Sequence, residues 1–295
     1  MHFTVICNKA SWEEKEIVKA ARKRNIECDI LLNQDLVLNL EKEEFDTDLF
    51  LQRSLSYFRG LYINAILESQ GYRVINSYYC ANICGNKLLT TLELIKNKIP
   101  TPKAYCAFTK KSALEALEYL GYPAVIKPIV GSWGRLVALL KDRDFAVAVL
   151  EDRETLGQLY HKIFYLQEYI WKPARNIEKY VSDRDKSPRD IRVLVIGDQV
   201  ITAMYRYEIK DDWRSTATLG ARSKPCKITP EIEEISLKAA KVVKGEILGL
   251  DLMESENGYL VQEINHTSGF KAASWTTGTD IAGRIVDYLI SQYKK

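Results

Sequence analysis

The sequence predicts an α/β unit at the N-terminus followed by α+β units. In residues 1–80, strand-like and helix-like segments alternate, as they do around a parallel sheet. The later part contains two pairs of short apolar runs joined by polar or glycine-containing turns, which are typical of hairpins. A chain of 295 residues ordinarily forms about two or three structural units. We therefore expect three domains, over 1–80, 81–170 and 171–295.

Residues 1–80 are expected to form a small layer around a parallel sheet. Its strands are predicted over 2–7, 28–32, 48–51 and 72–76, and its helices over 12–24 and 57–69.

The middle of the chain is expected to form a second layer that begins with a helix over 83–98. This helix carries Lys87 and ends before Pro100 and Pro102. The elements that follow are a strand over 104–108, a helix over 112–120 with Ser112 as its N-cap, a hairpin around Lys127, a helix near 142–160 and a strand over 164–170.

The last part of the chain is expected to be the larger α+β unit. A hairpin over 191–207 turns at Gly197-Asp198, and a polar loop over 209–228 precedes a helix after Pro230. A second hairpin covers 249–265. The final helix is amphipathic, with one apolar face formed by Ile281, Ile285, Leu289 and Ile290.

The second hairpin carries three oxygen-bearing side chains. Asp251 lies in its first strand, and Glu263 and Asn265 are two residues apart in its second strand, so both point to one face of the sheet. Carboxylate and amide oxygens are the ligands that Mg²⁺ prefers. The three residues are therefore candidate metal ligands, and the alternative for Asp251 is a polar patch on a half-exposed hairpin.

A glycine-containing loop lies about 120 residues upstream. The apolar run 122–128 leads into Gly-Ser-Trp-Gly-Arg at 131–135, which predicts a strand, a tight loop and a second strand. Backbone N–H groups of such a loop can approach phosphate oxygens, and Lys127 adds a compact positive charge. The loop matches neither the Walker A nor the dinucleotide-binding pattern, and an ordinary hairpin turn is the alternative.

Composition is that of an ordinary globular protein, with 46% apolar and 27% charged residues and a net charge of +3. Nucleic acid is not indicated as the main ligand. No apolar run approaches the length of a membrane span, and the first twenty residues resemble a strand and a charged helix, so we expect a cytoplasmic protein. The six cysteines are scattered, which argues against a zinc site or disulfides.

Other residues suit the binding of phosphates and carboxylates. The segment 165–170 is interpreted as an edge-like strand whose backbone could pair with an adenine, and Lys87 could supply a second cation. Arg192, Arg206 and Arg214 offer planar forks for carboxylates or phosphates. The alternatives are a solvent-facing, ion-paired Arg192 and a solvated surface Lys87. His266 is not expected to act as a base or to bind a metal; its closest expected position is directly behind the metal ligands.

These residues resemble the ATP-grasp carboxylate–amine ligases, and the resemblance covers residues 1 to about 290. Within that superfamily the chain is most similar to the ribosomal-protein glutamate ligase group, and above all to its lysine and arginine biosynthesis branch. The residues that carry the resemblance are Lys87, Val-Ile-Lys-Pro (125–128), Gly-Ser-Trp-Gly-Arg (131–135), Gln-Glu-Tyr-Ile (167–170), Arg-Asp-Ile-Arg-Val-Leu-Val-Ile-Gly (189–197), Gly-Leu-Asp (249–251) and Gln-Glu-Ile-Asn-His-Thr (262–267).

The resemblance implies an ATP-grasp fold in which two α+β subdomains sandwich ATP. It implies ATP and two Mg²⁺ ions as cofactors, with Mn²⁺ able to substitute. The implied reaction phosphorylates the side-chain carboxylate of the C-terminal glutamate of an acidic amino-group carrier protein. The α-amino group of 2-aminoadipate or glutamate then attacks the acyl phosphate. A homodimer or homotetramer is also implied.

The resemblance also implies roles for individual residues. Lys87 and Lys127 would bind ATP, and Arg192 would act on the acyl phosphate or the amino acid. The glycine-containing loop would contact the nucleotide through Gly131, Ser132, Trp133, Gly134 and Arg135. The strand would contact it through Gln167, Glu168, Tyr169 and Ile170, together with the nearby residue Glu178. Asp251, Glu263 and Asn265 would hold the metal, and Lys127 and Arg192 would stabilise developing charge.

Two segments depart from the pattern of these ligases. Relatives often have Asn where this chain has Thr216, after Trp213-Arg214-Ser215. The pair after Phe270-Lys271, commonly Asn-Thr in aminoadipate enzymes and Gly-Phe in glutamate enzymes, is Ala272-Ala273 here. We expect this pair, with Arg192, Arg206 and Arg214, to contact the amino acid and to accept either acid.

Two other functions stay open at this point. One is a related ligase that adds glutamate to a ribosomal protein or to a cofactor carboxylate. The other is a non-catalytic ATP-binding or scaffold protein, against which the intact set of Asp251, Glu263 and Asn265 argues.

Overall fold

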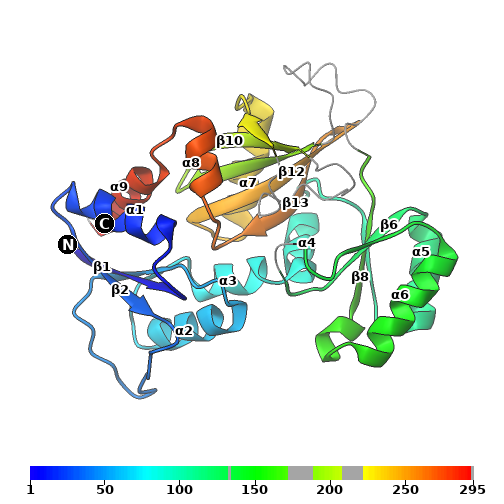
Figure 1. Ribbon diagram of the computed structural model, residues 1–295, viewed down its shortest axis with the longest axis horizontal. Helices are drawn as coiled ribbons and strands as arrows, with labels where there is room; N and C mark the ends of the chain where they lie inside the picture. The colour runs from blue at the N-terminus through cyan, green and yellow to red at the C-terminus, as the bar shows by residue number, and fades with distance from the viewer. Residues whose placement is uncertain (132–133, 172–188, 208–221, 294–295) are drawn as a thin grey trace.

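The computed structural model describes residues 1–131, 134–171, 189–207 and 222–293 (Figure 1). In these ranges the strands form three sheets that follow one another along the chain. The first sheet lies within the proposed domain 1–80, the second within 81–170 and the third within 171–295. None of the helices in the same ranges is long and apolar enough to cross a membrane.

The first sheet is parallel and has the strand order β2-β1-β3-β4. Its strands are β1 (His2–Cys7), β2 (Glu27–Leu32), β3 (Leu49–Gln52) and β4 (Val74–Ile75), and its helices are α1 (Trp12–Arg22) and α2 (Tyr57–Ser69). Figure 1 shows α1 on one side of this sheet, together with the C-terminal helix α9 (Ile281–Tyr293), and α2 on the other. Apolar side chains of both helix layers pack against the sheet. The predicted α/β layer is confirmed.

The single helix predicted over 83–98 is wrong. The chain instead forms α3 (Tyr78–Cys84) and α4 (Lys87–Lys96). The break lies at Asn86, whose extended backbone (φ −123°) makes it the N-cap of α4, and whose side chain accepts hydrogen bonds from two backbone N–H groups of the first turn. A Cβ at Gly85 would lie 1.8 Å from the Tyr57 ring, so only glycine fits there. Lys87 therefore starts a helix.

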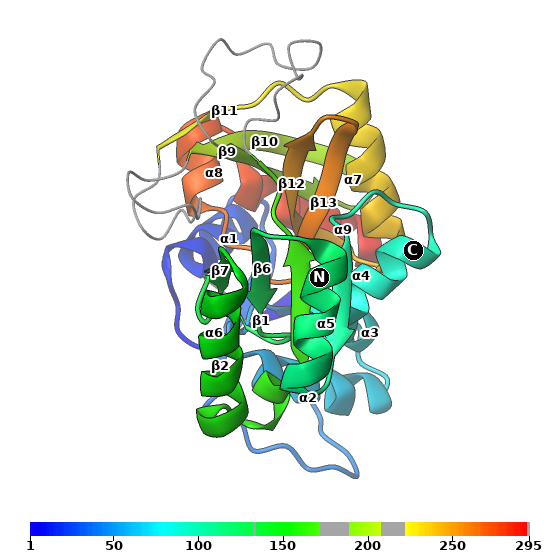
Figure 2. The ribbon, with the colours of Figure 1, turned by 90° about the vertical axis from the view of Figure 1, so that its right-hand side faces the viewer.

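The second sheet has the order β5-β8-β6-β7, and its paired strands are antiparallel. Its strands are β5 (Ala104–Ala107), β6 (Ala124–Lys127), β7 (Ala138–Leu140) and β8 (Phe164–Glu168), accompanied by α5 (Lys110–Leu120), α6 (Arg143–Leu156) and the 3₁₀ turn η1 (Leu159–Lys162). Figure 2 shows α5 and α6 in front of this sheet, where their apolar side chains form its core.

Two expectations for this part of the chain are corrected. The strand over 164–170 is internal, not edge-like, because β8 pairs with both β5 and β6 and is buried along most of its length. The N-cap of α5 is Thr109, not Ser112. Ser112 is the third helical residue, and its hydroxyl exchanges hydrogen bonds with Thr109 in a capping box.

The third sheet is antiparallel and has the order β11-β10-β9-β12-β13. Its strands are β9 (Arg189–Ile196), β10 (Gln199–Tyr207), β11 (Ser223–Pro225), β12 (Ile247–Ser255) and β13 (Gly258–Asn265), and its helices are α7 (Pro230–Val242), α8 (Lys271–Thr277) and α9. Both predicted hairpins are confirmed. Helix α8 was not predicted, because seven residues are too few to show a periodic apolar pattern.

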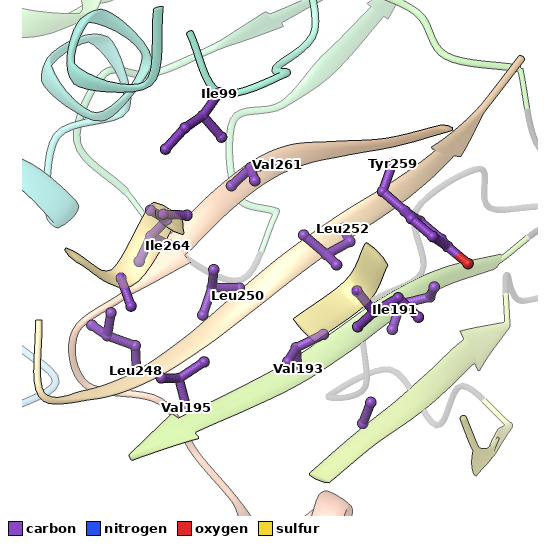
Figure 3. Packing of buried hydrophobic residues seen from close by; sticks show 14 of the residues in the cluster. Ile99, Ile191, Val193, Val195, Leu248, Leu250, Leu252, Tyr259, Val261 and Ile264 are labelled. Atoms are coloured by element: carbon purple, nitrogen blue, oxygen red, sulfur yellow. The ribbon is translucent and has the colours of Figure 1, made fainter. Parts of the chain in front are cut away.

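The two faces of the third sheet differ in chemistry. One face carries alternate apolar residues of β9 and β12, including Ile191, Val193, Leu250 and Leu252, and forms a core with α3, α4 and α7 (Figure 3). On the opposite face, Leu194 and neighbouring side chains form an apolar core with α9. The same face carries the polar side chains of Arg192 and Asp251, and it holds the candidate site.

Candidate active site

Three neighbouring strands bring the predicted metal ligands and Arg192 to one polar face. In the antiparallel register, Asp251 lies opposite Arg192 of β9 and also opposite Glu263 of β13, and Gly249 lies opposite Asn265. Directly opposed residues point to the same side of a sheet. The prediction that Asp251, Glu263 and Asn265 share a face is therefore confirmed.

Asp251 is buried and bound by two arginines. Arg192 Nε and Nη2 donate to its two carboxylate oxygens at 2.5 and 3.1 Å, and Arg206 Nη2 lies 2.9 Å from Oδ1. Burial raises the pKa of Asp251, but the charges of Arg192 and Arg206 outweigh it and hold the pKa below its ordinary value. Asp251 therefore remains ionised, as a metal ligand must be.

Arg206 is buried between two carboxylates. Its Nε donates to Asp190 Oδ1 at 2.7 Å, while its Nη2 faces Asp251, and all three side chains are at most 8% exposed. Burial lowers the pKa of Arg206, but Asp190 and Asp251 raise it further, to above its ordinary value. This arrangement disagrees with the expectation that the Arg206 guanidinium is presented to a substrate. The alternation of side chains along a strand indicates which face of the sheet a residue lies on, but it does not indicate which residue it pairs with.

Arg192 is the more accessible of the two arginines. Besides its contacts to Asp251, its Nη1 donates to the hydroxyl of Ser268 at 2.9 Å. A guanidinium has five N–H donors, so two of them have no acceptor among the described residues. Arg192 is thus ion-paired, as the alternative interpretation expected, but its side chain is only 15% exposed and does not face solvent as that interpretation also expected. It still has donors for an incoming anion.

Lys87 joins the glycine loop to the metal-ligand hairpin. Its Nζ donates to the carbonyl oxygen of Gly131 at 2.6 Å and to Glu263 Oε1 at 3.0 Å. The side chain is 14% exposed, so Lys87 is not a solvated surface lysine. Three segments that are distant in the sequence therefore meet at one ammonium group.

Lys127 is buried at the end of β6 and is held by β8. Its Nζ donates to Gln167 Oε1 at 2.6 Å, and Gln167 Nε2 donates to the Tyr165 hydroxyl at 3.2 Å. That hydroxyl lies 2.7 Å from the Thr91 hydroxyl. Burial raises the pKa of Tyr165 to about 12, so the phenol stays protonated and can donate. Sequence reasoning missed Tyr165 and Thr91, because neither belongs to a charged or glycine-containing pattern.

The remaining nucleotide candidates of the central sheet lie at the end of β8 and just after it, where Glu168 is opposite Ala124 of β6. Glu168 Oε1 accepts a hydrogen bond from the backbone N–H of Lys103 at 2.6 Å. Tyr169 and Ile170 follow β8, and the ring of Tyr169 lies edge-on to that of Trp171.

The described part of the glycine loop includes Gly131, Gly134 and Arg135. Gly134 has a φ of 66°, in the left-handed region that favours glycine. Arg135 is exposed. The predicted site residues Ser132, Trp133, Glu178, Arg214 and Thr216 lie outside the described residues.

The pair Ala272-Ala273 lies on α8. Ala272 is exposed, whereas Ala273 is buried in the apolar cluster that also contains Phe270. The two alanines thus face different surroundings, which disagrees with the expectation that both contact the amino acid. The short helix, which the sequence did not reveal, is the reason for this difference.

His266 follows the metal-ligand strand directly. Its ring lies 6.5 Å from that of Tyr57, and burial lowers its pKa to about 4. His266 is therefore neutral at physiological pH. A neutral ring beside Asn265 adds no charge to the site.

Solved structures with similar topology identify the class of fold. A RimK domain ATP-grasp protein from Sphaerobacter thermophilus has a TM-score of 0.78 over 98% of this chain and 99% of that chain, at 22% identity. A D-alanine–D-alanine ligase from Bacillus anthracis has a TM-score of 0.69 over 100% and 97% of the two chains, at 18% identity. The protein has the ATP-grasp fold.

Family models then identify the family. A LysX preATP-grasp domain matches residues 3–83, and a RimK-like ATP-grasp domain matches residues 84–289. The chain belongs to the RimK-like ATP-grasp family.

Curated relatives are similar over most of the chain. The alpha-aminoadipate–LysW ligase LysX of Saccharolobus solfataricus is 39% identical over 263 residues, which are 88% of this chain and 90% of the relative. The glutamate–LysW ligase ArgX of Sulfurisphaera tokodaii is 32% identical over 296 residues, which are 100% of both chains.

Proposed function

We propose that this protein is an ATP-dependent, ADP-forming carboxylate–amine ligase. It joins the side-chain carboxylate of the C-terminal glutamate of a small acidic amino-group carrier protein to the α-amino group of 2-aminoadipate or glutamate, in lysine or arginine biosynthesis. The observation that carries this proposal is the ammonium of Lys87, which touches both Gly131 of the phosphate-loop candidate and Glu263 of the metal-site candidate. The substrates are proposed from the names of the LysX and ArgX relatives.

The residues present fit a divalent metal with oxygen ligands. Two carboxylates, Asp251 and Glu263, and the amide of Asn265 share one sheet face. The side-chain nitrogen of Asn265 donates to the carbonyl oxygen of Gly249 at 3.4 Å, so the side-chain oxygen of Asn265 points away from Gly249. Glu263 already attracts a cation, Lys87. We propose that Asp251, Glu263 and Asn265 would hold two Mg²⁺ ions, replaceable by Mn²⁺, which would supply positive charge to offset the negative charge of the phosphates.

The basic residues of the site would act on charge that develops during the reaction. A carboxylate is a poor acylating agent, so one of its oxygens first attacks the γ-phosphorus of ATP and ADP leaves. Lys87 and Lys127 would hold phosphate oxygens in position, and the two remaining N–H groups of Arg192 would stabilise the acyl phosphate. The neutral amine then attacks the carbonyl carbon, and phosphate and a proton leave as the amide forms.

Nucleotide turnover tests the ligase assignment. We expect ADP to form only when Mg²⁺ or Mn²⁺, the carrier protein and an acidic amino acid are all present. The measurement is a coupled ADP assay in which each component is omitted in turn. Equal turnover without the carrier or without the amino acid would show that the protein is not this ligase.

A second function, glutamate transfer to another carboxylate, is favoured by a more distant relative. The tetrahydromethanopterin:alpha-L-glutamate ligase of Methanocaldococcus jannaschii is 28% identical over 95% of this chain. A carboxylated cofactor or a ribosomal protein tail in place of the carrier separates the two functions. Faster ADP formation with either of these acceptors than with the carrier would favour the second.

The choice of amino acid is proposed to be broad. Ala272, the exposed member of the pair, carries no polar group that could measure the length of a side chain. We expect glutamate and 2-aminoadipate to be used with kcat/KM values within about 200-fold of each other, the limit that one methylene usually imposes. Competition between equal concentrations, read by the mass of the carrier product, tests this. Exclusive use of one acid would show that another residue measures the substrate.

The oligomeric state is proposed to be a homodimer or homotetramer. Light scattering of the purified protein at micromolar concentration measures it directly, and a monomer would contradict it.

A further inference from the structure

A buried serine links Arg192 to the N-terminal sheet. The hydroxyl of Ser268 accepts a hydrogen bond from Arg192 Nη1 at 2.9 Å. Its backbone carbonyl accepts one from Arg53 Nη1 at 2.8 Å, although Arg53 lies 215 residues away in the sequence, just after β3. One residue therefore contacts both the arginine proposed to meet the acyl phosphate and a buried arginine of another sheet.

Arg53 is itself held firmly. Its Nε donates to Glu14 Oε1 at 3.2 Å, and both side chains are at most 6% exposed. Glu14 also accepts hydrogen bonds from Ser11, where it closes the capping box of α1. The Arg53 guanidinium also lies over the Phe270 ring, 5.4 Å from its centre. Because Glu14 and Phe270 both hold Arg53, it can fix the carbonyl of Ser268 in turn.

Gly249 makes room for this contact. A Cβ at Gly249 would lie 2.2 Å from Ser268 Oγ and 3.4 Å from Arg192 Nη1. Any larger residue in β12 would push the serine hydroxyl away from the guanidinium. The close approach of β12 to Ser268 explains in physical terms why glycine is present at this position.

We propose that Arg53 is a positioning residue for the ligase reaction and that it acts through Ser268 on Arg192. This inference rests on the proposed function. Asp251 binds the Nε and Nη2 edge of Arg192, and Ser268 binds Nη1, so the guanidinium plane is fixed on two sides. Its two remaining donors then keep one direction toward the reacting phosphate. A displacement of about 1 Å in such a group can reduce a rate about 100-fold.

Kinetics of a double-mutant cycle test the inference. Ser268→Ala and Arg53→Met should each lower kcat about 10- to 100-fold and leave the KM for ATP within about twofold. The double variant should be no slower than the slower single variant, because both changes break one relay. The matched control is Arg73→Met, which removes the 2.6 Å ion pair to Glu246 without touching Ser268 and should leave kcat unchanged.

The conservative variant Arg53→Lys separates positioning from folding. Lysine keeps a charge beside Glu14 but lacks the fork that also reaches Ser268, so thermal stability should return toward that of the wild type while kcat stays low. Recovery of kcat in Arg53→Lys, or losses that multiply in the double variant, would overturn the proposal and leave Arg53 a purely structural residue.

A substrate-free measurement distinguishes failure of this inference from failure of the proposed function. In protein with ¹⁵N-labelled arginine, the Nη signals of Arg192 should be separate and sharp, because rotation about the Cζ–N bonds is hindered, and should average in both Ser268→Ala and Arg53→Lys. Signals unchanged in Arg53→Lys would contradict the relay. If the wild type forms no product while these signals respond as expected, the proposed function fails and the relay stands.

Discussion

Replacing Arg206 with methionine should destabilise the C-terminal sheet severely. The guanidinium lies 2.7 Å from Asp190 and 2.9 Å from Asp251, and all three side chains are at most 8% exposed. Methionine retains the apolar stem but removes the charge that both carboxylates face. Asp251 would keep only Arg192 as an ion-pair partner among the described residues.

The expected magnitude follows from burial. Breaking a buried ion pair by removing one partner costs about 3–5 kcal/mol, because a buried charge loses its compensation. This is a large part of the roughly 5–15 kcal/mol that stabilises a typical domain. An exposed ion pair is worth only about 0–1 kcal/mol, so Arg73→Met, whose side chain is 47% exposed in the wild type, is the matched control.

Hydrogen–deuterium exchange of peptides from β9 and β12 measures the effect locally, which matters because a chain of several units need not unfold in one step. We expect protection in Arg206→Met to fall about 10²- to 10⁴-fold, and that in Arg73→Met to fall less than about tenfold. Asp190→Asn in the Arg206→Met background should recover part of the loss. A loss below tenfold in Arg206→Met would refute the structural role and make Arg206 a substrate-binding candidate again.

Three further changes test separate parts of the site. Glu263→Ala should abolish ADP formation while circular dichroism stays native, since it removes a proposed metal ligand; near-normal activity would contradict the metal site. Gln167→Leu should raise the KM for ATP at least about tenfold, because it removes the 2.6 Å hydrogen bond from Lys127 to Gln167 that helps to hold the ammonium in position; an unchanged KM would contradict this. Burial lowers the pKa of His266 from 6.5 in the unfolded chain to about 4 in the folded protein. As the pH falls from 6.5 to 4, the unfolded state therefore takes up a proton that the folded state does not. The free energy of unfolding should decrease over this range by up to about 3 kcal/mol. His266→Asn should flatten this dependence in urea titrations, and an unchanged slope would contradict it.

Periodicity predicted the parts of the site that depend on one strand or one hairpin. Glu263 and Asn265 share a face because they are two residues apart, and Asp251 joins them because the hairpin register opposes it to Glu263. The bounds of α2, predicted over 57–69, are those observed. In each case the signal lies within one continuous segment of the chain.

Contacts between distant segments could not be predicted in this way. The break between α3 and α4 depends on the Tyr57 ring that fills the space beside Gly85, and the internal place of β8 depends on its pairing with β5. The same holds for Arg53 and Ser268, which are 215 residues apart. A single sequence shows which residues are polar or apolar, whereas these contacts depend on which segments meet in three dimensions.

Intact-mass analysis of the carrier protein tests the central claim most directly. After incubation with ATP, Mg²⁺, glutamate or 2-aminoadipate and this protein, the carrier should gain the mass of one amino-acid residue, and fragmentation should locate the gain at its C-terminal glutamate. A carrier of unchanged mass while ADP accumulates, or a gain at any other residue, would contradict the account.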